Sequence, residues 1–76
     1  ADLWILAAPT GRFDEYCAQV RREYAAVPPD LYARERGRIL GALRDRPRLY
    51  ASPLAYAEWE PRARANLRRE LERLAG

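Results

Sequence analysis

Histidine, lysine and methionine are absent from this 76-residue sequence, and cysteine occurs only once, at Cys17. Histidine is the commonest general base and metal ligand in proteins, and without it neither Ser52 nor Cys17 has an imidazole to activate it. A lone cysteine forms no internal disulfide, and one cysteine without histidine does not make a zinc site. The sequence therefore does not predict an enzyme that works by itself, and Cys17 is expected to be a small buried apolar side chain.

Long apolar runs are also missing. The opening stretch LWILAA is far shorter than the roughly 20 apolar residues that a membrane-spanning helix needs. It also lacks the basic leader of a signal peptide. We therefore expect a cytoplasmic protein with no membrane partner.

Charge is plentiful but mixed. All 14 basic residues are arginine, and 11 acidic residues are interleaved with them, which leaves a net charge of +3. Nucleic-acid-binding domains usually gather their basic residues on one face, whereas an interleaved pattern is typical of a solvated surface. The pattern argues against a nucleic-acid partner.

Two arginines and a tyrosine are nevertheless candidates for contact with a phosphorylated ligand. Arg34 and Arg38 could bind phosphate through bidentate hydrogen bonds, and Tyr50 could add stacking. The favoured interpretation is that Tyr32 belongs to the core and that the arginines are solvated or paired with acids such as Glu35, because charge runs on helices usually face water.

Proline divides the chain into helical segments. Residues 2–7 read as the last turns of a helix that is apolar on all sides, hence buried, and that ends before Pro9. Thr10 can cap a second helix over residues 11–26, whose apolar residues recur every three or four positions: Phe13, Tyr16, Cys17, Val20, Tyr24 and Val27. A third helix is expected from residue 29 or 30 to 46, in which Gly37 and Gly41 would let another backbone approach closely.

A final helix should follow the Ser52-Pro53 start signal. Its apolar stripe comprises Tyr56, Trp59, Ala63, Leu67, Leu71 and Leu74. Pro61 should either kink this helix or split it, and the pairs Glu58–Arg62 and Glu60–Arg64 should partly offset the disruption.

At the edge of that stripe, a partly buried Asn66 amide should bond a neighbouring loop or helix end. Nothing alternates with period two, so the predicted fold is all-α. We expect a helical bundle fragment of about four helices, with no domain boundary within residues 1–76.

Several strings occur in a fixed order along most of the chain. They are Asp2-Leu3-Trp4-Ile5-Leu6, Tyr16, Val20-Arg21, Glu23-Tyr24, Val27-Pro28, Arg38, Arg46-Pro47-Arg48-Leu49-Tyr50 and Ala63-Arg64-Ala65-Asn66-Leu67. Together they resemble the C-terminal half of a bacterial family of predicted metal-dependent phosphohydrolases of the HD superfamily. Ala7-Ala8 departs from the family's Gly-Ala at that position.

The resemblance implies a helical hydrolase of phosphoester bonds that holds one or two divalent metals, such as Mn²⁺, Mg²⁺ or iron. The superfamily's ligands are a His, a His-Asp doublet and a final Asp, and only the final Asp has an equivalent here, at Asp2. A carboxylate suits a divalent cation, and a bound metal would activate water and polarise the phosphoryl oxygen. No residue here can supply the other ligands, so this chain alone should neither hold the metal nor act as an enzyme.

The resemblance therefore implies a C-terminal portion of a larger HD-type domain that contributes Asp2 and helices supporting the cleft, with Arg34, Arg38 and Tyr50 as substrate contacts. Its partner would be the missing N-terminal half, or self-association in its place. Its substrate would be a phosphorylated small molecule or a nucleotide. The alternative is a non-enzymatic helical module that binds a protein or, weakly, nucleic acid.

Overall fold

The computed structural model describes residues 3–76, and over this range it contains helices and no strands. A short 3-10 helix, η1 (Leu3–Ala7), precedes three α-helices: α1 (Thr10–Glu23), α2 (Pro29–Arg44) and α3 (Pro53–Ala75). The prediction of an all-α chain is confirmed, and the expected number of about four helical elements is close. Within the described residues, no helix combines the length and the apolar character needed to cross a membrane.

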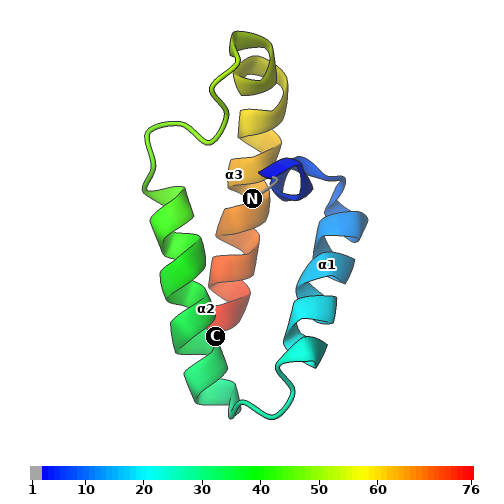
Figure 1. Cartoon of the computed structure of the whole chain (residues 1–76), viewed down its shortest axis with the longest axis vertical. Helices are drawn as coiled ribbons and strands as arrows, with labels where there is room; N and C mark the ends of the chain where they lie inside the picture. Colours follow the sequence, from blue (N-terminus) through cyan, green and yellow to red (C-terminus); the bar gives the residue numbers. More distant parts are fainter. Residues whose placement is uncertain (1–2) are drawn as a thin grey trace.

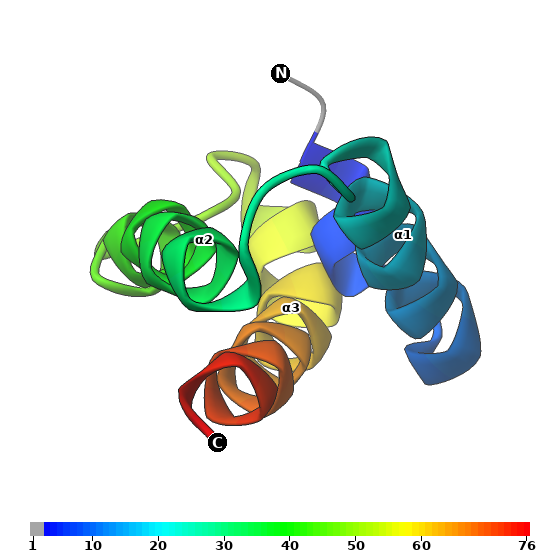
Figure 2. The ribbon, with the colours of Figure 1, turned by 90° about the horizontal axis from the view of Figure 1, so that it is seen from below.

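The longest helix, α3, is the scaffold of the molecule. It packs against α2 and η1, and less extensively against α1. Figure 1 shows α2 and α1 on opposite sides of α3, and the view from below in Figure 2 shows η1 between α1 and α2. The four elements form a bundle with extents of 40 × 22 × 22 Å. The first residues of the described chain are thus packed among all three helices.

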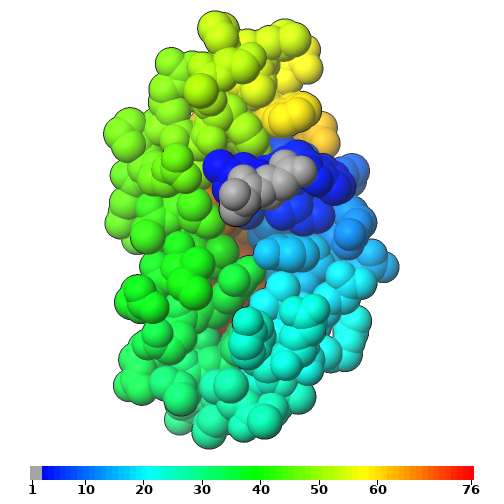
Figure 3. Space-filling model, viewed as in Figure 1, coloured from blue at the N-terminus to red at the C-terminus, as the bar shows by residue number. Residues whose placement is uncertain are grey.

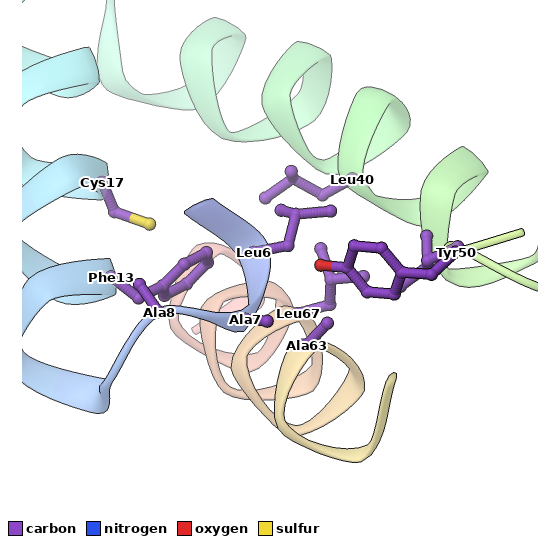
Figure 4. Packing of buried hydrophobic residues seen from close by; sticks show 10 residues of the cluster. Leu6, Ala7, Ala8, Phe13, Cys17, Leu40, Tyr50, Ala63 and Leu67 are labelled. Atoms are coloured by element: carbon purple, nitrogen blue, oxygen red, sulfur yellow. The ribbon is translucent and has the colours of Figure 1, made fainter. Parts of the chain in front are cut away.

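One apolar core joins the four elements. Figure 4 shows the side chain of Leu6 pointing from η1 toward Leu40 of α2, with Phe13 of α1 and Leu67 of α3 in the same cluster. Phe13 and Leu67 are 1% and 0% exposed. Cys17 is buried and free, as predicted, and Tyr32 is buried as well. A chain this short buries only about 60% of the surface of its unfolded state, so each of these contacts matters to stability.

The first segment differs from its prediction. It was expected to be the end of an α-helix that is buried all round, but η1 is a 3-10 helix in which only Leu6 and Ala7 are buried and Trp4 is 47% exposed. Pro9 prevents the helix from continuing, and 3-10 turns are common at helix ends and in connections between helices. Asp2 lies outside the described residues.

Of the two predicted helix caps, one is confirmed and one is wrong, and Pro61 does not split its helix. Thr10 does not cap α1, because the helix begins at Thr10 itself: the carbonyl of Pro9, at φ −53° and ψ 151°, already accepts from the Phe13 N–H. Ser52 does cap α3, and its hydroxyl accepts from the Ala55 N–H at 3.4 Å. Pro61 does not split α3, which is one continuous helix over 23 residues.

The close backbone approach expected at the glycines of α2 is absent. Apart from the nearby backbone of α2 itself, a Cβ added at Gly37 would meet no atom within 4 Å, and one at Gly41 would meet only the end of the Arg44 side chain, at 3.6 Å. Gly41 is buried, but the contact between α2 and α3 does not require the absence of a side chain at either glycine. Neither glycine is needed for it, and we expect both to lower helix stability without compensation.

Candidate functional site

The side chains of α3 and of the loop before it converge on the backbone of η1. The Asn66 amide donates to the carbonyl oxygens of Leu6 (2.8 Å) and Ala8 (3.0 Å). The Tyr50 hydroxyl donates to the carbonyl of Leu3 at 2.7 Å. Arg62 donates to the carbonyl of Ala7 at 3.2 Å in place of the expected pair with Glu58. Four carbonyl groups of residues 3–8 are thus held by side chains from 47 to 60 positions away.

The sequence of η1 explains why it needs these donors. A helix leaves its last carbonyl groups without partners inside the helix, and buried carbonyls must find donors elsewhere. In a 3-10 helix the carbonyl of Leu6 would accept from the third residue along, but that residue is Pro9, which has no N–H. Asn66 supplies the donor. The prediction that its amide bonds a neighbouring helix end is confirmed.

Asn66 is itself held in place by Arg69 of the same helix, which is paired with Asp14 of α1. Its side-chain oxygen accepts from Arg69 at 3.0 Å, and Arg69 also forms an ion pair with Asp14 at 2.8 Å. The hydrogen bond from Arg69 holds the pKa of the Asp14 carboxyl below its usual value. The Nε atom of Arg69 is buried and without a partner among the described residues. This chain of contacts fixes the amide's orientation and ties α1 to α3.

Tyr50 is positioned by a buried carboxylate. Glu60, 5% exposed, accepts from the backbone N–H groups of Leu49 (3.1 Å to each carboxylate oxygen) and Tyr50 (3.3 Å). It also pairs with Arg64 at 2.8 Å, as predicted. Arg64 in turn donates to the carbonyls of Arg44 and Arg46, each at 2.7 Å. A buried charge is costly unless it is paired and hydrogen-bonded, and Glu60 meets both conditions. We therefore infer that Glu60 has a structural role, which is to fix the loop that contains Tyr50.

A second polar cluster lies where α1, α2 and α3 face one another. It lines a hollow of about 360 Å³ and includes Cys17, Tyr32, Glu70 and Arg73. Glu70 is 5% exposed and accepts from Arg73 at 2.6 Å. Burial, with a smaller contribution from Glu70, raises the pKa of the Cys17 thiol to about 12, and burial also raises the pKa of Tyr32. A thiol that stays protonated at neutral pH is not a nucleophile, so this cluster does not form a catalytic centre around Cys17.

Two of the candidate phosphate contacts, Arg34 and Arg38, lie on α2, and the third, Tyr50, lies in the loop before α3. Tyr50 is 8% exposed and packs edge-on against Trp59, with ring centroids 5.4 Å apart, while its hydroxyl bonds to η1. Arg38 is exposed and pairs with Glu35 at 3.0 Å, which matches the expected pairing. Arg34 is exposed and borders a hollow beside the last residues of α3. Arg34 and Arg38 are one helical turn apart on α2 and could contact the same phosphate, whereas the hydroxyl of Tyr50 is already bonded to η1.

Metal ligands are not gathered within the part of the chain that the structure describes. No three Asp, Glu, Cys or His side chains among residues 3–76 lie in an arrangement that could hold a metal ion. Asp2, the one ligand implied by the resemblance, is not among those residues. The described residues thus do not make up a metal site, and we derive no catalytic step through a metal from them.

The sequence predicted the hydrogen bonds of Asn66 to a helix end. It did not predict the bond from Arg62 to the Ala7 carbonyl, nor the bonds that Glu60 accepts from the backbone of Leu49 and Tyr50. The missing N–H of Pro9 was a usable signal, because it leaves a carbonyl that needs a donor. Nothing comparable pointed to Arg62, which was assigned to a local pair four residues away.

No protein-family model, curated protein or solved structure matches this chain.

Proposed function

We propose that this chain is the C-terminal helical portion of a metal-dependent phosphohydrolase of the HD superfamily. In this proposal Asp2 is one metal ligand, and the remaining ligands come from the N-terminal half of the same domain. The reaction is hydrolysis of a phosphoester in a phosphorylated small molecule or a nucleotide, and the protein acts in the cytoplasm. The metal, when bound by the complete domain, supplies the activated water.

The observation that supports the proposal is the anchoring of η1. Tyr50 and Asn66 belong to the strings RPRLY and ARANL, on which the resemblance rests, and both donate to backbone carbonyls of η1. Leu3, the residue next to Asp2 in the sequence, is the one bonded by Tyr50. Two separate strings of the resemblance thus hold the same segment, η1, which follows the proposed ligand Asp2 in the sequence.

Holding the segment that follows a ligand is what a metal site requires of its surroundings. Ligands must be held to within about half an ångström of productive geometry, and outer contacts that orient them are worth roughly 10–100-fold in affinity or activity. A fixed 3-10 turn is a better base for a ligand than a mobile chain end. In the proposal, α1, α2 and α3 are the supporting frame, and Asn66 and Tyr50 act on the site through η1.

The test uses the full-length protein that contains this chain, incubated with Mn²⁺ or Mg²⁺ and with p-nitrophenyl phosphate and nucleoside monophosphates as probes. We expect metal-dependent release of phosphate, and its abolition in Asp2→Ala. The matched control is Asp30→Ala, because Asp30 is an exposed aspartate in the first turn of α2. Turnover that survives Asp2→Ala while Asp30→Ala behaves the same would contradict the assignment of Asp2.

A second candidate function, a non-enzymatic binding module, is favoured by one surface. The Arg48 guanidinium stacks on Tyr56 with its carbon 4.1 Å from the ring centroid, and Tyr56 and nearby Trp59 are 42% and 43% exposed. Arginine and exposed aromatic rings together can bind single-stranded nucleic acid. This candidate predicts binding to single-stranded DNA or RNA that weakens steeply with salt, and the absence of binding at low salt would remove it.

A further inference from the structure

Three polar side-chain atoms, one from each α-helix, line a single hollow without a hydrogen-bond partner among residues 3–76. α1 and α2 make little direct contact, and Figure 3 shows the surface hollowed between α2 (green) and α1 (cyan), beneath η1. The hollow of about 360 Å³ lies between the same two helices and reaches α3, and we call it the polar hollow. Its unpartnered atoms are the thiol of Cys17 on α1, the hydroxyl of Tyr32 on α2 and one carboxylate oxygen of Glu70 on α3.

Glu70 is the buried acidic group of the polar hollow. Its side chain is 7% exposed, and Arg73 engages only one of its two carboxylate oxygens, at 2.6 Å. The other oxygen is not sealed inside the protein. Glu70 also lies close to Cys17 and Tyr32, because its charge adds to the effect of burial in raising the pKa of both groups. Since a largely buried carboxylate oxygen without a donor is costly, the hollow favours a ligand that brings a charged N–H donor.

A primary ammonium group fits these acceptors, because it can donate to the free oxygen of Glu70 and to the Tyr32 hydroxyl at the same time. A ligand with a positive charge alone would be repelled by Arg21 and Arg73, which line the same hollow. Arg73 is half-exposed, and its guanidinium has more N–H donors than its contacts with Glu70 and Asp14 use. A carboxylate on the same ligand would therefore bind Arg73. A ligand that carries both charges matches the hollow better than a ligand with either charge alone.

Apolar residues, most of them small, complete the lining of the polar hollow. They are Ala18, Pro29, Ala33 and Leu74. Ligand pockets in proteins commonly measure roughly 300–1,000 Å³, so a hollow of about 360 Å³ suits a small ligand. We propose that the polar hollow binds a free amino acid with an apolar side chain, its ammonium group on Glu70 and Tyr32 and its carboxylate on Arg73. This site goes beyond the proposed phosphohydrolase function and does not depend on it.

Titration of the isotope-labelled chain with three matched probes, followed by NMR, tests this site. The probes are L-leucine, isoamylamine, which is leucine without its carboxylate, and isocaproate, which is leucine without its ammonium group. We expect leucine to shift the amide signals of residues that line the polar hollow. Each analogue should bind at least about 10-fold more weakly than leucine, because it lacks one charge-assisted hydrogen-bonding group.

Two variants with matched controls locate the binding. Glu70→Gln keeps the size of the side chain and removes its charge, and it should weaken leucine binding at least about 10-fold. Tyr32→Phe removes only the hydroxyl and leaves the ring in place, so it tests the site even if Glu70→Gln does not fold. It should weaken leucine binding roughly 3–10-fold. The controls Glu72→Gln and Tyr56→Phe alter exposed side chains on α3 and should bind leucine like the wild type.

Three results would overturn the site. One is a spectrum that does not change at tens of millimolar leucine. Another is equal affinity for leucine and isoamylamine, which would mean that Arg73 does not bind the carboxylate. The third is leucine binding that is unchanged in both Glu70→Gln and Tyr32→Phe, which would place the ligand elsewhere. The presence or absence of phosphatase activity does not bear on any of these results, so this site and the proposed function stand or fall separately.

Discussion

Replacement of Asn66 should be among the most destabilising single changes in this chain. Asn66→Ala removes the donor to the carbonyls of Leu6 and Ala8 and the acceptor for Arg69. The side chain is 1% exposed, so water does not readily replace it. A buried group left without its partner costs roughly 1–3 kcal/mol.

Two contributions set the size of the stability loss. The carbonyls of Leu6 and Ala8 lose their donor, and the missing amide leaves a small cavity. We expect a loss of about 3 kcal/mol in the free energy of unfolding. A chain of this length is stable by roughly 4–11 kcal/mol, so the loss is a large fraction of the total. In a domain of this size it corresponds to a fall of roughly 12–24 °C in Tm.

The assay is urea unfolding followed by circular dichroism, with Asn66→Asp as the second variant and Arg68→Ala as an exposed control on the same helix. Asn66→Asp keeps the size of the side chain but points an oxygen at two carbonyl oxygens. It should therefore destabilise at least as much as Asn66→Ala, while Arg68→Ala should stay within about 0.5 kcal/mol of wild type. A loss below about 1 kcal/mol for Asn66→Ala, or an Asn66→Asp variant of wild-type stability, would refute the anchoring of η1.

Three further predictions concern other parts of the frame. Gly37→Ala should raise the free energy of unfolding by about 0.5–1 kcal/mol in urea titrations, because the added methyl meets open space in a helix interior; a loss of stability would mean that the α2–α3 packing is tighter than described. Native Cys17 should resist iodoacetamide up to about pH 9 and react once urea unfolds the chain, since its pKa is raised to about 12; rapid labelling of the folded chain would contradict its burial. The pKa of Asp14 is lowered by Arg69, so its contribution to stability is present above about pH 4 and is lost as the pH falls through the lowered value; Asp14→Asn should flatten this acid limb, and an unchanged pH profile would count against the ion pair.

The helical fold follows from local patterns in the sequence. The three α-helices were predicted from apolar spacing and proline positions, and Ser52 was identified as a cap because its hydroxyl bonds a neighbour only three residues away. Thr10 was misassigned because Pro9, with its carbonyl free to accept, starts the helix one residue earlier. The predicted end of the second segment, residue 26, lies three residues beyond the end of α1 at Glu23, and the predicted end of the third, residue 46, lies two beyond the end of α2 at Arg44, because local rules fix helix ends only approximately.

Long-range contacts were predictable only where the backbone chemistry demanded a partner. Asn66 was expected to bond a helix end because a buried amide must be satisfied, but η1 could not be named as that end from spacing. Arg62 and Tyr50 could each make several local contacts, and only the folded chain brings them to carbonyls 55 and 47 positions away. The glycines of α2 were predicted to allow close approach of another backbone because they are four residues apart, but no other backbone approaches either of them.

The central claim is that this chain supports a metal site to which Asp2 contributes. The most direct measurement is the Mn²⁺ affinity of the full-length protein by calorimetry, for wild type, Asp2→Asn and the control Asp30→Asn. Outer contacts alone are worth roughly 10–100-fold, so the loss of a direct ligand should weaken Mn²⁺ binding by more than about 100-fold, with Asp30→Asn unchanged. Equal affinity for Mn²⁺ in wild type and Asp2→Asn would contradict the claim.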